Sequence, residues 1–133
     1  MLSIGEQVKH WTDSAERDCA TMKVLLNSRR YPESLFFGHI VLEKMLKAFV
    51  ILATKEQPPK IHDLSYLTKL ADLGLDKNTL NYFELVNKFN IRARYDDYKK
   101  AFYKSCTKGY AEEHVQKITK IYKELCQKIK QKK

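Results

Sequence analysis

Apolar residues recur at spacings of three and four along most of this chain, and this period constrains its fold more than any other feature. The first stripe lies between positions 4 and 28 and comprises Val8, Trp11, Ala15, Asp18, Met22 and Leu25. Such spacing places side chains on one face of an α-helix. No strand-type alternation stands out, and 4 Gly and 3 Pro among 133 residues leave few breaks. The sequence therefore predicts an all-α fold.

The pattern divides the chain into about five helices within a single domain that covers residues 1–133. They are expected at 4–28, at 31–53 with Pro32 in the first turn, from 62 or 63 to 73, at 76–90, and from about 110 onward. Pro58 and Pro59 separate the second helix from the third, and Gly74 ends the third. Positions 91–105 are less regular.

These helices predict an up-and-down bundle. The short connection at 28–33, which reads SRRYPE, makes the first two helices antiparallel neighbours. We expect the fifth helix to complete the bundle and the third and fourth to lie across one end. Because so few helices cannot enclose every apolar stripe, we also expect a homodimer.

The composition is that of a cytoplasmic protein. Hydrophobic residues make up 44% and charged residues 31%, which excludes a disordered chain, and no apolar run approaches a membrane span. The N-terminal residues lack the pattern of a secretory signal. Cys19, Cys106 and Cys126 are far apart and form no CxxC pair, so we expect reduced thiols rather than disulfides or a zinc site.

Positive charge is concentrated near the C-terminus. Nearly all of the net charge of +9 belongs to residues 99–133, where the lysines far outnumber Glu112, Glu113 and Glu124. Such a segment favours polyanions, namely RNA, DNA, nucleotides or an acidic protein. A solvated lysine-rich helix face is the alternative interpretation.

The segment 87–98 is the strongest candidate for ligand binding. Arg92 and Arg94 can hold phosphates in two-pronged contacts, and the rings of Tyr95 and Tyr98 offer stacking surfaces. The structural alternative is a polar network of Arg–Asp pairs and tyrosine hydroxyls that joins the fourth helix to the last one. The adjacent Asp96 and Asp97 diverge, which argues against a metal site.

The histidines have structural and functional interpretations. His62 and Asp63 are expected to cap the third helix, while the alternative makes His62 an acid/base or a phosphate donor. His39 is expected to be a hydrogen-bonded core or interface residue, and His10 and His114 to lie at the surface.

Other charged residues are expected to form ion pairs. Asp18, on the apolar stripe, is expected to pair with an Arg or a Tyr, because an unpaired buried acid is costly. Glu43 and Lys47 are spaced to pair on the outer face of the second helix. No cysteine has a base beside it, and no glycine-rich phosphate loop occurs.

Several motifs in order resemble the HEPN domain, the higher-eukaryote and prokaryote nucleotide-binding family. They are WTDSAERD at 11–18, YPESLFFGHIVLEKMLKA at 31–48 with its telling EK-x-LKA, IHDLSYL at 61–67, and Arg94-Tyr95-x-Asp97 before the last helix. The resemblance covers almost the whole chain. It implies a helical bundle that usually dimerises and associates with nucleotides or RNA, often beside a small nucleotidyltransferase in toxin–antitoxin-like pairs.

The ribonuclease branch of that family uses an Arg followed by four to six residues and then a His. This chain departs from the pattern: the eligible positions after Arg92 hold Asp97, Tyr98 and Lys99, and those after Arg94 hold Lys99, Lys100 and Ala101. None of these side chains shuttles a proton near neutral pH as histidine does. The sequence therefore favours the non-nucleolytic branch.

Together these observations predict a protein that binds a nucleotide or related phosphate ligand without a cofactor or metal, and that acts with a partner such as a minimal nucleotidyltransferase. The candidate ligand-binding residues are Arg92, Arg94, Tyr95, Asp97, Tyr98, His62 and Lys44. The alternatives are a metal-independent ribonuclease, with His62 or His39 as the proton carrier, and a module that only docks proteins.

Overall fold

The computed structural model describes residues 2–132 and contains six helices in that range. They are α1 (Ile4–Asn27), α2 (Tyr31–Thr54), α3 (Leu64–Leu70), α4 (Lys77–Arg94), α5 (Asp96–Ser105) and α6 (Lys108–Lys132). No strand occurs among the described residues. The predicted all-α bundle is confirmed, with one helix more than the sequence pattern indicated.

Local chemistry explains where the helices begin. Ser3 caps α1 through a reciprocal pair of hydrogen bonds with Glu6. Asp63 caps α3 and Asp76 caps α4, because each carboxylate accepts from a backbone N–H in the first turn. Pro32 stands in the first turn of α2, where its missing N–H costs nothing.

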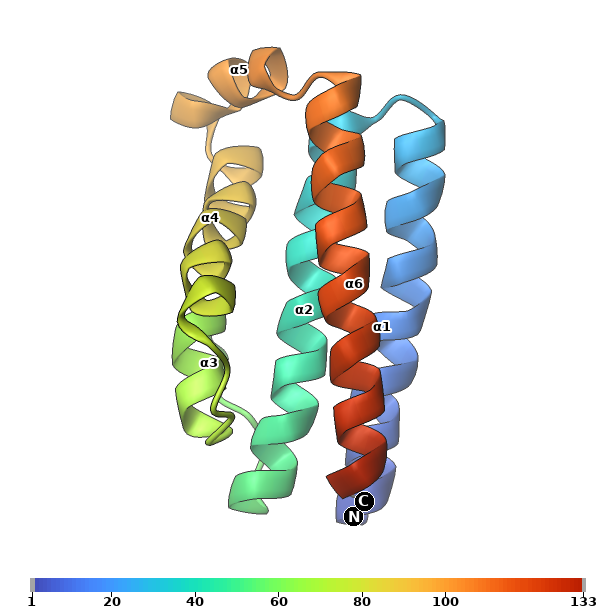
Figure 1. Ribbon diagram of the computed structural model, residues 1–133, viewed down its shortest axis with the longest axis vertical. Coiled ribbons are helices and arrows are strands. Elements are labelled where there is room, and N and C mark those ends of the chain that lie inside the picture. Colours follow the sequence, from blue (N-terminus) through green and yellow to red (C-terminus); the bar gives the residue numbers. More distant parts are fainter. Residues whose placement is uncertain (1, 133) are drawn as a thin grey trace.

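The long helices α1, α2 and α6 lie side by side, and α3 and α4 flank the other side of α2 (Figure 1). α5 crosses the end of the bundle where α1 connects to α2 and where α6 begins, and both termini lie at the opposite end (Figure 1). The expectation that the third and fourth helices cross an end was wrong. They pack lengthwise against α2 because that helix is apolar on nearly every face.

The core is built around α2, whose buried residues contact α1, α3, α4 and α6. Gly38 allows the closest approach: a Cβ at this position would lie 2.6 Å from Ile118 Cδ1 and 3.3 Å from Met22 Sδ. The three helices α1, α2 and α6 therefore meet at a point where any side chain on α2 would collide. Within residues 2–132, no helix combines the length and apolar character needed to cross a membrane.

Candidate ligand-binding site

Arg92 and Arg94 form the last turn of α4, and Tyr95 is the single residue between α4 and α5. The side chains of Tyr95 and Tyr98 are 56% and 53% exposed. Within the described residues, neither guanidinium makes a hydrogen bond or an ion pair. The Arg–Asp pairs of the alternative interpretation do not form among the described residues, and Asp96 and Asp97 lie in the first turn of α5. The junction presents two unpaired cations beside two exposed rings.

Arg92 also lies close enough to Cys106 to influence it electrostatically. Burial raises the pKa of the Cys106 thiol to about 11, and the nearby guanidinium offsets part of that rise. The thiol is thus protonated at neutral pH. A protonated thiol is a weak nucleophile, so Cys106 is not activated by its surroundings.

His62 lies on Glu43 in the middle of α2. Its Nδ1 is 3.0 Å from Glu43 Oε1 and 3.1 Å from Oε2, while Lys47 Nζ donates to Oε2 at 2.9 Å. Glu43 and Lys47 are only 7% and 6% exposed, so the expectation that they pair on the outer face was wrong. The pair forms, but against the loop that carries His62. The imidazole itself is largely exposed.

His39 fixes the backbone of that loop. A carbonyl oxygen can only accept, so His39 Nε2 donates to the His62 carbonyl at 2.8 Å, and Asn90 Nδ2 lies 3.3 Å from His39 Nδ1. Burial lowers the pKa of His39, which keeps this imidazole neutral. The expectation of a hydrogen-bonded core histidine is confirmed.

Asp63 and Asn87 join the same loop to α4. Asp63 Oδ1 accepts from the backbone N–H of Ser65 at 3.0 Å and from Asn87 Nδ2 at 3.0 Å, and Asn87 Oδ1 accepts from the Leu64 N–H at 3.0 Å. Asp63 alone provides the predicted cap of α3. The His62 ring is consequently free for its contact with Glu43.

Lys44 faces the opposite side of α2. Its Nζ lies 2.6 Å from Asp18 Oδ2 and 2.6 Å from Ser14 Oγ, both on α1. Asp18 does have a partner, as the sequence predicted, but that partner is a lysine rather than an arginine or a tyrosine. Lys44 holds α2 against α1.

His114 was expected at the surface, and this expectation was wrong. It is 3% exposed, its Nδ1 lies 2.6 Å from Tyr82 Oη, and its ring centroid lies 4.4 Å from that of Tyr110. Burial raises the pKa of Tyr82 and lowers the pKa of His114, so the phenol keeps its proton and donates to the neutral imidazole. The sequence signal for burial was the position of His114 one turn before Ile118, on the buried stripe of α6.

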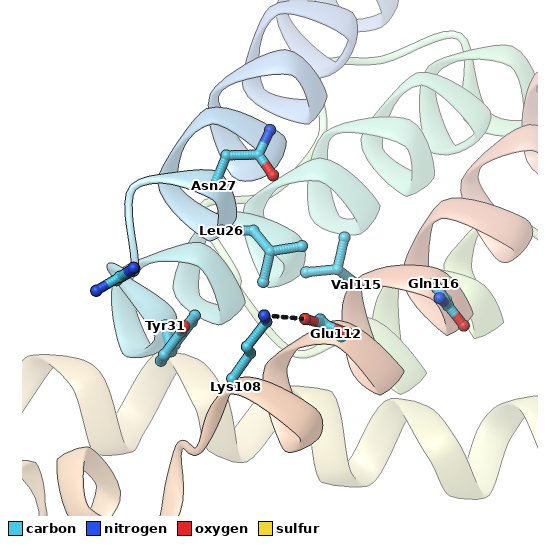
Figure 2. Close-up of a pocket in the computed structure, with 8 residues that line it drawn as sticks. Leu26, Asn27, Tyr31, Lys108, Glu112, Val115 and Gln116 are labelled. Atoms are coloured by element: carbon cyan, nitrogen blue, oxygen red, sulfur yellow. Dashed lines mark ion pairs between the residues drawn. The ribbon is translucent and has the colours of Figure 1, made fainter.

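A groove of about 680 Å³ opens between the α1–α2 connection and the first turns of α6 (Figure 2). Its apolar lining comes from Leu26 and Val115, and its polar lining from Asn27, Arg29, Tyr31, Lys108, Glu112 and Gln116. In the same view Lys108 approaches Glu112, with the two charged groups 3.8 Å apart. None of these residues was a candidate from sequence. Among the described residues, no group of three or more His, Cys, Asp or Glu could hold a metal ion.

The model of the HEPN domain family matches residues 8–130. The chain belongs to the HEPN family. No curated protein and no solved structure matches it significantly. The match includes α2 to α5 entirely and most of α1 and α6, so the resemblance seen in the sequence motifs is confirmed.

The candidate residues of this HEPN domain lie in three places. The α4–α5 junction contains Arg92, Arg94, Tyr95, Asp97 and Tyr98. His62 contacts Glu43, and Lys44 pairs with Asp18. His62 and the junction are related through α4: Asn87, Ile91 and Arg94 follow one another at helical spacing, and Asn87 contacts the residues next to His62. Lys44 has no such relation, because it faces α1.

Proposed function

We propose that this HEPN domain binds a nucleotide or related phosphate ligand at the α4–α5 junction. The observation that carries the proposal is the pair of guanidiniums on Arg92 and Arg94, which have no partner within the described residues. Unpaired arginines that flank exposed tyrosine rings suit a ligand that combines a phosphate with a flat base. Membership of a family that includes nucleotide-binding proteins supports this choice.

Each side chain of the junction has a role in this proposal. Arg92 and Arg94 hold phosphate oxygens, and Tyr95 and Tyr98 stack on the base. Asp97, in the first turn of α5, orients a guanidinium or accepts from a ribose hydroxyl. His62 provides a further polar contact from the α2–α3 loop, whereas Lys44 is left out because Asp18 occupies it.

A thermal-shift panel with ATP, GTP and other nucleotides tests this binding. A ligand at about 100 times its Kd stabilises the fold by about 2.7 kcal/mol, which raises the Tm by several degrees. The double variant Arg92→Ala/Arg94→Ala should lose this shift, while Lys120→Ala/Lys123→Ala on the exposed face of α6 should keep it. A shift that persists in the arginine variant would place the ligand elsewhere.

We further propose that the domain forms a homodimer and acts with a partner protein such as a minimal nucleotidyltransferase in the cytoplasm. Ile91, Tyr95 and Tyr98 expose apolar surface near one another along the chain, as an interface requires. The free thiols of all three cysteines suit a reducing compartment. Light scattering of the purified protein should give twice the mass of the chain, and the mass of a single chain would contradict the dimer.

A metal-independent ribonuclease is the second candidate, and the contact between His62 and Glu43 favours it. The carboxylate holds Nδ1 of an exposed imidazole, which leaves Nε2 free to exchange a proton with solvent or a ligand. Arg94 lies seven residues beyond Asn87 on α4, which is about 10 Å along the helix axis. A phosphate held there would leave room for a ribose near His62.

RNA cleavage that continues in the presence of a chelator and disappears in His62→Ala would support the ribonuclease. His10→Ala is the matched control, because His10 is exposed on α1. Cleavage that the His62 variant retains, or that purified protein never shows, would leave nucleotide binding as the function.

A further inference from the structure

Arg29, in the connection between α1 and α2, occupies a backbone position that favours glycine. Its φ is 64°, in the left-handed region. Its N–H donates to the Leu26 carbonyl at 3.1 Å, and the Arg30 N–H donates to the Leu25 carbonyl at 2.8 Å, the two bonds of a Schellman turn. Glycine adopts this conformation without strain, whereas a side chain there is strained. The strain gives no benefit to folding, so the arginine side chain calls for a role of another kind.

The role follows from the groove that Arg29 lines, between the α1–α2 connection and the first turns of α6 (Figure 2). Its volume of about 680 Å³ lies within the range of about 300–1,000 Å³ that is usual for small-molecule sites. Within residues 2–132, no protein group pairs with the Arg29 guanidinium, the side-chain amides of Asn27 and Gln116, or the Tyr31 hydroxyl. Only solvent or a ligand can satisfy these donors and acceptors.

The groove carries charges of both signs. Lys108 Nζ and Glu112 Oε1 are 3.8 Å apart, and the two side chains are 75% and 45% exposed. Such an exposed pair contributes little stability, so a ligand can separate its members easily. Arg29 adds a second cation. Glu33 of α2 does not line the groove and accepts from Tyr103 instead. Two cations and one carboxylate therefore face the same space.

We propose that this groove binds a free α-amino acid with an apolar side chain. Arg29 and Lys108 hold the carboxylate, and Glu112 accepts from the ammonium group. The side chain of the ligand packs on Leu26 and Val115. One carbon atom separates the two charged groups of an amino acid, which matches opposite charges that lie next to one another in the groove. A phosphate would match the cations but would be repelled by Glu112.

The amino-acid site does not depend on nucleotide binding at the α4–α5 junction. The groove is lined by the α1–α2 connection and the first turns of α6, and it shares no residue with the junction formed by Arg92, Arg94, Tyr95, Asp97 and Tyr98. Either site can therefore be present without the other, and each has its own test.

Calorimetric titration with leucine measures the binding, and two analogues test the role of each charge. Isocaproate lacks the ammonium group and isoamylamine lacks the carboxylate, so each should bind at least about tenfold more weakly than leucine, because each loses a charged hydrogen bond. Glu112→Gln should weaken leucine binding by a similar factor and leave isocaproate binding unchanged, since isocaproate has no ammonium group for Glu112 to hold.

Arg29→Gly separates the role of the side chain from that of the fold. Because glycine relieves the strain at φ 64°, this variant should keep a Tm at or above the wild-type value and still bind leucine at least about tenfold more weakly. Lys55→Gly is the matched control. Lys55 is exposed at the end of α2 with a φ of 61°, so glycine relieves the same strain there and should leave leucine binding unchanged.

Three results would overturn the inference. The first is no binding of leucine, valine, methionine or phenylalanine by wild type. The second is binding of isocaproate as tight as that of leucine, and the third is an unchanged affinity in Arg29→Gly. AMP serves as the phosphate probe. Binding of AMP that Arg29→Gly abolishes, in a protein that does not bind leucine, would assign the groove to phosphates and reject the amino acid.

Discussion

At the scale of single residues, the least expected feature is a charged cluster inside the most apolar helix. Glu43 and Lys47 are almost fully buried on α2, and Lys47 Nζ lies 5.4 Å from the centre of the Trp11 ring. Transferring both charges from water to the protein interior costs free energy. The cluster is tolerated because each charged group has a partner of opposite charge. Through this arrangement the buried Glu43 contacts His62, whose imidazole is largely exposed.

Removing one member of the cluster should therefore be far more costly than breaking a surface pair. We expect Lys47→Ala to lower the free energy of unfolding by about 3 kcal/mol, because it leaves Glu43 without its cation and removes the contact with Trp11. Lys9→Ala, which breaks an exposed pair with Asp13, should cost far less, because solvent screens exposed charges. Urea unfolding of both variants measures the difference. Equal losses would show that burial adds nothing to the pairing.

At the scale of elements, the sequence predicted the helices that carry an apolar stripe and missed the one that does not. In α5 the only buried residue is Phe102, so no period of 3.6 could be seen between positions 91 and 105. The placement of His114 failed for a related reason. A polar residue on the stripe of α6 was assigned to the surface, although its partner Tyr82 is distant in sequence and could not be identified before the fold was known.

In the candidate site, too, local features could be predicted from the sequence and contacts between elements could not. The α4–α5 junction could be predicted because its residues are consecutive, and the Asp63 cap because capping is local. The contacts of His62 with Glu43 and of Lys44 with Asp18 join different elements, so neither pairing could be derived from spacing.

Phe102 is the one side chain of α5 that the structure buries, and this leads to a prediction for the helix. Phe102 is 2% exposed and its ring centroid lies 5.9 Å from that of Phe89. In Phe102→Ala we expect α5 to detach while the rest of the bundle stays folded, so the global loss should fall below the roughly 3–5 kcal/mol typical of such a truncation. Hydrogen exchange should show fast exchange in α5 and unchanged protection in α2, whereas Lys100→Ala should change neither. Faster exchange throughout α2 would contradict a separate α5.

At the scale of the whole molecule, two buried imidazoles make stability depend on pH, and both pack against α4. His39 contacts Asn90 from α2, and His114 contacts Tyr82 from α6. Burial lowers the pKa of both histidines in the folded chain, so the unfolded chain takes up protons more readily as the pH falls. Their contribution to stability is therefore complete above the unfolded pKa of about 6.5 and is lost progressively below it.

Each histidine should lower the free energy of unfolding by up to about 1.4 kcal/mol per pH unit between its unfolded and folded pKa values. Urea unfolding at about pH 7.5 and 5.5, on either side of the unfolded value, measures this loss. His114→Phe keeps a ring in the site but cannot take up a proton, so it should be less stable at the higher pH and lose less on acidification. His10→Gln, at an exposed position, should retain the full loss. If His114→Phe were as sensitive to acid as wild type, the proton uptake would belong to other groups, and α4 would not be the element through which acid loosens the bundle.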